Sequence, residues 1–242
     1  VVNKLASNEY YKYLIDPGGV QGPFVQKIGN ISSRISNGTG QAVFSADGTH
    51  YLRFSDTDDL LVFNFDRCSG ELSSFLHVVV PGNEEFQLNS GLAISPNSRY
   101  AYTFCGKYAY QLDLEASDIA ASLTLIGEWD GTLVDGIWPT YFNVAALAPD
   151  GKIYGAGHSI PYLHIVHQPD LPAPDCQFEQ HAILLPEPVW HGKAMPLLPD
   201  YHMGPLKGSP CDSLTVHTDT ATGTNKDFFR LGPNPTAGAF QV

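Results

Sequence analysis

Three stretches of the chain share one pattern of apolar runs, turns and alternating segments. They are AVFSADGTHYLRFSDTDDLLVFNFD from Ala42, LAISPNSRYAYTFCGKYAYQLDL from Leu92 and AALAPDGKIYGAGHSIPYLHIVHQPD from Ala145, at offsets of 50 and then 53 residues. After a short apolar run and a turn, apolar and polar residues alternate, which is typical of β-strands. We expect two-residue turns to join the first strands of each stretch as β-hairpins, at Asp47-Gly48, Asn97-Ser98 and Asp150-Gly151.

The length of the repeat indicates how the strands are organised. Units of this length, each made of several short strands, cannot bury both of their faces alone and stack on their neighbours. A four-stranded blade of a β-propeller fits the length and the spacing of the turns. The segments GELSSFLHVVV, ASLTLIGEWDG and CQFEQHAILLP follow the three repeats, and we expect them to form the outermost strands of the blades.

Residues 1–41 read as the later strands of a preceding blade, with Asp16-Pro17-Gly18-Gly19 as its turn. The sequence therefore predicts an all-β fold, a β-propeller with four-stranded blades of about 50 residues, of which about four are present. An open ring would expose an apolar blade face, so we expect a larger ring, completed by missing N-terminal sequence or by a second copy. A two-layer β-sandwich with coincidental turns is the alternative fold.

Charge and hydropathy argue against a nucleic acid partner and against a membrane-spanning segment. The chain has 242 residues, with 13 Lys or Arg against 25 Asp or Glu, and a formal net charge of −12. A surface of this sign repels phosphate backbones, so we expect no nucleic acid partner. No apolar run approaches the roughly 18 residues needed for a membrane span. The start has no Met and no signal peptide, which indicates a piece of a longer precursor.

The repeats resemble a known group of propellers. FSADG, ISPNSRYAY and LAPDGKIY look like the WD40-like, TolB/YVTN-like propeller repeats of exported bacterial proteins. FNFDRCSGELS, DLEASDIAASLTLIGEWDG, HQPDLPAPDCQFEQH and YHMGPLKGSPCD are similar to segments of uncharacterised propeller proteins from Bacteroidetes. The resemblance covers roughly residues 40–215. It implies a fold but no activity.

The composition changes after the last repeat. We expect propeller blades over residues 1–205, a linker rich in Gly, Ser, Thr and Asp over residues 206–227, and the start of a truncated domain over residues 228–242. That last segment, FFRLGPNPTAGAFQV, resembles the C-terminal sorting domain of the type IX secretion system, with its matching turn at Pro233, Asn234, Pro235, Thr236 and Gly238. The resemblance implies export by that machinery to a secreted or outer-membrane surface location, outside the cell.

Short patterns add candidate modification sites. Asp212-Ser213-Leu214 and Asp219-Thr220-Ala221 resemble the Asp-Ser/Thr-apolar acceptor of Bacteroidetes O-glycosylation, so Ser213 and Thr220 are candidate sites. The four cysteines permit three pairings, and none has the CxxC spacing of a metal site. Cys176 and Cys211 both lie in Pro-rich irregular segments and are the candidate disulfide, whereas Cys105, in a strand-like run, is expected to be a buried thiol.

Patterns that would carry catalysis are weak. His158 and His164 could share a strand face and bind a metal with inward carboxylates, but a hydrogen-bonded core histidine is the commoner role for His164. The acidic turn Asp56-Thr57-Asp58-Asp59 offers oxygen ligands for calcium without EF-hand spacing. Gly157-His158-Ser159 lacks the final Gly of a nucleophile elbow. We therefore assign no catalytic or cofactor-binding residue, leave the metal open, and keep calcium as the one candidate ion.

Two functions remain open. The first is a non-enzymatic, secreted or cell-surface propeller that acts as a binding or structural module; its partners would be a protein or glycan ligand, copies of itself in a surface assembly, and the secretion machinery. The second is an extracellular enzyme of hydrolase, lactonase or lyase type, with its site in the central channel. Three or more Asp, Glu or His around one ion would favour the enzyme, and aromatic side chains without an ion would favour the binding module.

Overall fold

The computed structural model describes residues 1–16, 19–31, 40–85, 90–158 and 160–186. The chain divides into two units, Val1–Gly204 and Pro205–Val242, and all described residues belong to the first. These residues form strands almost exclusively; the helical elements among them are the 3-10 turns η1 (Asn83–Glu85) and η2 (Ala120–Ser122). In this part of the chain, no helix has the length and apolar character that crossing a membrane requires.

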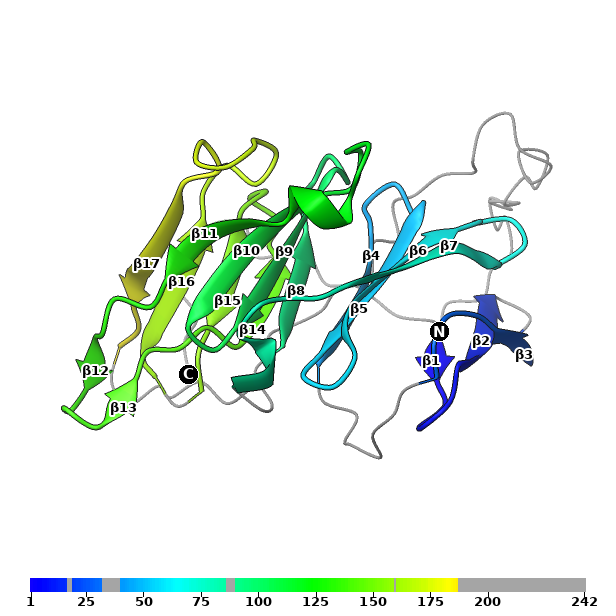
Figure 1. Cartoon of the computed structure of the whole chain (residues 1–242), viewed down its shortest axis with the longest axis horizontal. Helices are drawn as coiled ribbons and strands as arrows, with labels where there is room; N and C mark the ends of the chain where they lie inside the picture. The colour runs from blue at the N-terminus through cyan, green and yellow to red at the C-terminus, as the bar shows by residue number, and fades with distance from the viewer. Residues whose placement is uncertain (17–18, 32–39, 86–89, 159, 187–242) are drawn as a thin grey trace, which may run out of the picture. The chain divides into compact units, whose positions relative to one another are not determined.

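Three antiparallel four-stranded sheets follow one another along the described chain (Figure 1). They are β4 (Gln41–Phe44), β5 (His50–Ser55), β6 (Asp59–Phe65) and β7 (Leu72–Val78); β8 (Gly91–Ile94), β9 (Tyr100–Cys105), β10 (Tyr108–Asp113) and β11 (Thr124–Glu128); and β14 (Val144–Leu147), β15 (Ile153–Ala156), β16 (Tyr162–Val166) and β17 (Phe178–Leu184). Their first strands begin at the predicted offsets of 50 and 53 residues. The segments expected to be outermost form β7, β11 and β17, so the all-β fold of four-stranded blades is confirmed.

The N-terminal sheet has three strands in the described chain, β1 (Val2–Asn3), β2 (Glu9–Asp16) and β3 (Gly19–Lys27). The pairing of β2 with β3 runs from Glu9 opposite Lys27 to Asp16 opposite Gly19. The chain therefore reverses where the sequence predicts the turn of a partial blade, although Pro17 and Gly18 themselves lie outside the described residues.

The strands β8, β9 and β10 of the middle sheet are buried on both faces, because their alternate residues pack on opposite neighbours. From β9, Tyr102 and Phe104 pack with Phe142 and residues of the β14–β17 sheet. Ala101 and Cys105 point the other way and pack with residues of the β4–β7 sheet. A third cluster joins β2 to that sheet through residues Tyr10, Tyr51, Leu61, Phe63 and Leu72. The core therefore lies between successive sheets, as in stacked propeller blades, and not inside a sandwich.

The innermost strands β4, β8 and β14 are neighbours in space. The side-chain amide of Gln41 on β4 joins all three. Its oxygen accepts from the N–H groups of Leu92 (3.0 Å) and Ala145 (2.8 Å), and its nitrogen donates to the Ala145 carbonyl (2.9 Å). The strands approach so closely here that a Cβ on Gly91 would lie 2.5 Å from the Asn143 carbonyl oxygen.

The turns that follow the innermost strands differ from the prediction. Five residues, not two, separate β4 from β5, and the other two repeats have the same loop length. In the first loop the Gly48 N–H donates to the Ser45 carbonyl (2.9 Å), while the Asp47 carboxylate accepts from the Ser45 hydroxyl (2.6 Å) and the Thr49 N–H (3.0 Å). The two-residue prediction is wrong, because the carboxylate binds backbone and hydroxyl groups that a tighter hairpin would pair across the strands.

The cysteines also correct one prediction. Cys176 is a free thiol, 1% exposed, in the cluster between the β8–β11 sheet and the β14–β17 sheet. The expected bond from Cys176 to Cys211 is therefore not formed, because the Cys176 side chain is packed into the core instead of lying at the surface; Cys211 itself lies outside the described residues. Cys105 is a buried thiol that is not in a disulfide, as predicted, and it donates to the Tyr108 carbonyl.

Candidate functional site

The connection from β11 to β14 contains a projecting hairpin made of β12 (Leu133–Val134) and β13 (Trp138–Pro139). The Ile137 N–H donates to the Val134 carbonyl at 3.1 Å, and the two residues between them, Asp135 and Gly136, have φ values of 53° and 67°. Positive φ at both central residues is what a type I′ turn requires. In Figure 1 the hairpin lies beside the lower end of the β14–β17 sheet. We call residues 129–142 the Trp loop.

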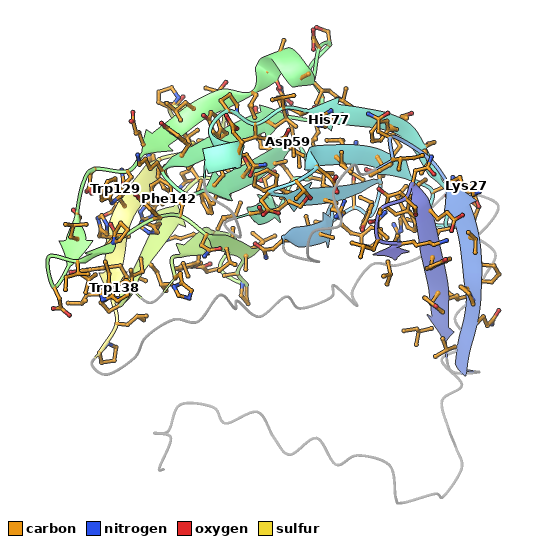
Figure 2. The ribbon with its side chains drawn as sticks, turned by 60° about the horizontal axis from the view of Figure 1, so that its bottom comes forward. Lys27, Asp59, His77, Trp129, Trp138 and Phe142 are labelled. Carbon is orange, nitrogen blue, oxygen red and sulfur yellow. The ribbon has the colours of Figure 1, made fainter. Side chains whose placement is uncertain are left out.

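Trp129 fixes the base of this loop. Its indole N–H donates to the Thr132 carbonyl (3.2 Å) and to the Thr140 hydroxyl (3.1 Å), so it bridges the two ends of the hairpin. The Thr140 N–H donates to the same Thr132 carbonyl at 3.2 Å. At the end of the loop, Phe142 exchanges two backbone hydrogen bonds with Gly106, which lies between β9 and β10 of the middle sheet (2.9 and 2.8 Å). Figure 2 labels Trp129, Trp138 and Phe142.

The outermost strand of the last described sheet reaches the Trp loop through a β-bulge. The register of β16 and β17 shifts between Leu163 and Ile165, and His181, in the bulge, has a φ of 56°. Its N–H donates to Nδ1 of His164 at 3.3 Å, in place of a strand carbonyl. A bulge re-aims side chains. Here Nε2 of His181 lies 2.6 Å from the Thr140 hydroxyl and Nδ1 lies 3.5 Å from the Asp130 carboxylate.

Further contacts hold the Trp loop against β17. The Gln180 side chain donates to the Glu128 carbonyl (2.8 Å) and accepts from the Asp130 N–H (3.3 Å). The rings of Trp129 and Tyr141 pack edge to face with centroids 4.9 Å apart, and Tyr162 packs on His181 in the same way at 5.1 Å. The loop is thus held by side chains from β16 and β17 as well as by its own hydrogen bonds.

The ionisable groups beneath the loop have shifted pKa values. Burial lowers the pKa of His181, although the charge of Asp130 opposes this. Burial also raises the pKa of Asp130, but hydrogen bonds from Thr132 and the charge of His181 outweigh it, and the net pKa is lowered. For the fully buried His164, burial first and then His181 lower the pKa to about 3. At neutral pH the site therefore holds an ionised Asp130 and two neutral imidazoles.

The order of Asp130, His181 and Thr140 is that of a carboxylate, an imidazole and a hydroxyl in hydrolase triads. The Thr140 side chain is, however, fully buried, and its hydroxyl also donates to the Thr132 carbonyl (3.1 Å) and accepts from Trp129. A hydroxyl has one proton and two lone pairs. The proton and both lone pairs of the Thr140 hydroxyl are used within the described chain. In this conformation Asp130, His181 and Thr140 therefore hold the loop in place and present no free nucleophile.

The hairpin above this base exposes large apolar side chains. Leu133, Ile137 and Trp138 are 44%, 68% and 49% exposed. The segment 128–142 carries Glu128, Asp130 and Asp135 and no Lys or Arg. The basic residue next to it is Lys107, whose carbonyl accepts from the Trp129 N–H at 2.7 Å. The loop therefore presents large apolar side chains on a segment whose charged residues are all acidic.

The structure separates the histidines that the sequence grouped. His164 is a hydrogen-bonded core histidine, as expected. His158 is exposed in the loop after β15; its neighbour Gly157 lies against the Tyr141 carbonyl, which places His158 near the Trp loop. His167 pairs with Glu179 at 2.7 Å. Across the described ranges, no three His, Cys, Asp or Glu side chains are grouped so that they could hold a metal ion.

The acidic turn considered for calcium has protein partners. The Asp58 carboxylate pairs with Arg53 at 2.7 Å, and Asp59 accepts from the side chain of Asn83 at 2.9 Å and lies 3.6 Å from His77. Other predicted sites lie outside the described residues, namely Ser159, Ser213, Thr220, Pro233, Asn234, Pro235, Thr236 and Gly238.

Sequence reasoning missed the Trp loop, although a signal for it was present. Asp135-Gly136, flanked by Leu-Val and Ile-Trp, is a strong short-range indication of a two-residue hairpin. The contact of His181 with Thr140 had no comparable signal, because it depends on a bulge in β17 and on residues 41 positions apart.

Comparisons with known proteins add a likeness of fold alone. No protein-family model matches the sequence, and no curated protein matches it. The structure resembles the dihydro-heme d1 dehydrogenase NirN in complex with DHE, with 19% identity and a TM-score of 0.35 over 53% of this chain and 25% of that one. It also resembles a predicted 6-phosphogluconolactonase from Bacteroides uniformis, with 13% identity and a TM-score of 0.45 over 76% of this chain and 50% of that one. A protein of unknown function from Desulfotomaculum acetoxidans matches with 14% identity and a TM-score of 0.40 over 67% of this chain and 49% of that one. The chain thus spans a quarter to a half of the length of these proteins.

Proposed function

We propose that this chain is the binding module of a secreted or cell-surface propeller protein, and that the Trp loop is its contact surface. The observation that supports this is a preformed hairpin that places Trp138 at 49% exposure while its base is fixed by Trp129, Thr140 and His181. Ordering a loop before binding reduces the entropy lost in the complex. Tryptophan is among the residues that contribute most to binding when a partner buries it.

The secreted or cell-surface location that we propose for the protein rests on its sequence. The turn Pro233-Asn-Pro-Thr-x-Gly238 resembles the type IX sorting signal, and the repeats resemble exported propellers. We propose that the type IX machinery exports the protein, with Ser213 and Thr220 as candidate glycosylation sites in the linker. Expression in a Bacteroidetes host with and without a working type IX system tests this: surface exposure should depend on that system, and equal exposure in both hosts would contradict it.

An enzymatic function is the alternative, and one observation favours it, the relay order of Asp130, His181 and Thr140. A hydrolase or lactonase using this relay would need the loop to open, because the Thr140 side chain is buried. Ester and lactone hydrolysis that is lost in both Thr140→Val and His181→Asn, at unchanged folding, would favour the enzyme over the binding module.

The binding function is tested with the whole chain on arrays of extracellular proteins and glycans. We expect Trp138→Ser to abolish binding to the ligand that wild type selects, because Trp138 supplies the largest exposed ring of the hairpin. Tyr13→Ser is the matched control, since Tyr13 is similarly exposed (47%) on β2 of another sheet. Binding that Tyr13→Ser loses and Trp138→Ser keeps would overturn the assignment of the Trp loop.

A further inference from the structure

The chemistry of the Trp loop narrows the class of ligand. Trp138 projects from one strand of the hairpin, and the aliphatic side chain of Ile137 is exposed next to it at the turn. Leu133 is also exposed, but it pairs with Pro139 and therefore lies on the other face of the hairpin. A glycan surface consists of hydroxyl groups with small apolar patches and leaves aliphatic side chains without good partners. Large aromatic and aliphatic side chains together fit an apolar pocket on a protein, where water is excluded from both sides.

Charge indicates what surrounds that pocket. The carboxylates of Glu128, Asp130 and Asp135 lie on the same segment as the apolar residues, with no Lys or Arg among residues 128–142. Asp130 keeps its negative charge at neutral pH, since hydrogen bonds from Thr132 oppose the effect of burial and help to hold the pKa of its carboxyl below the usual value. Opposite charges across an interface speed association and exclude wrong partners, whereas like charges in contact are costly. The complementary surface is therefore basic.

The same charge argument disfavours two other occupants. A second copy of this chain has a net charge of −12, so the overall electrostatic interaction opposes its approach to an acidic loop. A membrane with anionic headgroups would repel the same carboxylates. A protein with Lys or Arg around an apolar pocket meets neither obstacle.

We propose that the β12–β13 hairpin docks into an apolar pocket rimmed by Lys or Arg side chains on a partner protein. This inference rests on the proposed binding function and adds the class of partner. Trp138 enters the pocket, Ile137 covers its wall, and Glu128 and Asp135 pair with the basic rim. Trp129, Thr140 and His181 hold the hairpin in its bound shape before the partner arrives.

The probe is a phage-displayed library of random 12-residue peptides, selected against the whole chain and counter-selected against Trp138→Ser. We expect the enriched peptides to combine Lys or Arg with aromatic or aliphatic residues. A synthetic copy of the leading peptide, followed by fluorescence anisotropy, should bind Trp138→Ser about 10- to 100-fold more weakly than wild type. Binding to Tyr13→Ser should equal wild type, and thermal unfolding confirms that both variants are folded.

A second variant tests the charges separately from the apolar contact. Asp135→Asn removes one carboxylate, and Asn tolerates the positive φ of this position. We expect about threefold weaker binding of the basic peptide and a smaller dependence of affinity on salt, because exposed charges are screened by ions. Enriched peptides that are uncharged or acidic, or an unchanged affinity and salt dependence in Asp135→Asn, would overturn the basic partner while leaving a Trp138-dependent binding function intact. If no peptide and no array ligand depends on Trp138, the proposed function itself fails.

Discussion

His164 gives the last described sheet a pH-dependent stability. Burial and the neighbouring His181 lower its pKa to about 3, although Asp130 opposes the shift. The pKa of a histidine in the unfolded chain is near 6.5, so below that pH the unfolded state binds more protons than the folded state. The contribution of neutral His164 is therefore complete above about pH 6.5 and is lost progressively as the pH falls from there towards 3.

The variant His164→Gln tests this, because Gln cannot titrate but can still offer an oxygen to the His181 N–H. We expect its free energy of unfolding at pH 7 to be about 1–2 kcal/mol below wild type, since Gln packs less well between Phe142 and Phe178. Between pH 7 and 4.5 it should lose less stability than wild type in urea unfolding. Parallel profiles for His164→Gln and wild type would contradict the assignment.

At the scale of elements, the β12–β13 hairpin depends on the two positive φ values of its turn, at Asp135 and Gly136. Gly136 has a φ of 67°, a region that β-branched residues avoid. We expect Gly136→Val to loosen the β12–β13 hairpin and weaken ligand binding, while the melting temperature changes little, because the hairpin contributes no residue to the three core clusters. Hydrogen exchange should accelerate at Ile137 and not in β9. Gly131→Val, in the same loop and also at positive φ, shows whether the effect is specific to the turn.

The elements that sequence predicts well are those whose signal is local. Short apolar runs at 50- and 53-residue offsets locate β4, β8 and β14 correctly. In β8 and most of β14 both faces are buried, and such a strand needs apolar residues along its length. The offset also locates β4, although Gln41 is its one buried residue. The conformations of the loops were harder to predict. Asp47 carries the composition of a two-residue turn but bonds Ser45 and Thr49, which the sequence alone does not reveal. The candidate site depends on a bulge at His181, which re-aims one side chain towards a distant loop, and no sequence period encodes that.

At the scale of the molecule, Gln41 couples three blades at their innermost strands. Its amide meets two N–H groups and one carbonyl on β8 and β14, and it is only 9% exposed. Met has a similar length and no hydrogen-bonding amide. Gln41→Met would therefore leave buried backbone groups of Leu92 and Ala145 without these partners, and each such group costs about 1–3 kcal/mol.

We expect Gln41→Met to lower the free energy of unfolding by about 2–4 kcal/mol, measured in urea. Hydrogen exchange should accelerate at Leu92 and Ala145, where the lost bonds were, and remain unchanged in β17, which lies at the outer edge of its sheet. Gln168→Met, at an exposed position, controls for the chemical change and should leave stability within about 0.5 kcal/mol of wild type. If Gln41→Met is as stable as that control, the blades are joined by their apolar faces alone and the amide contributes nothing to their coupling.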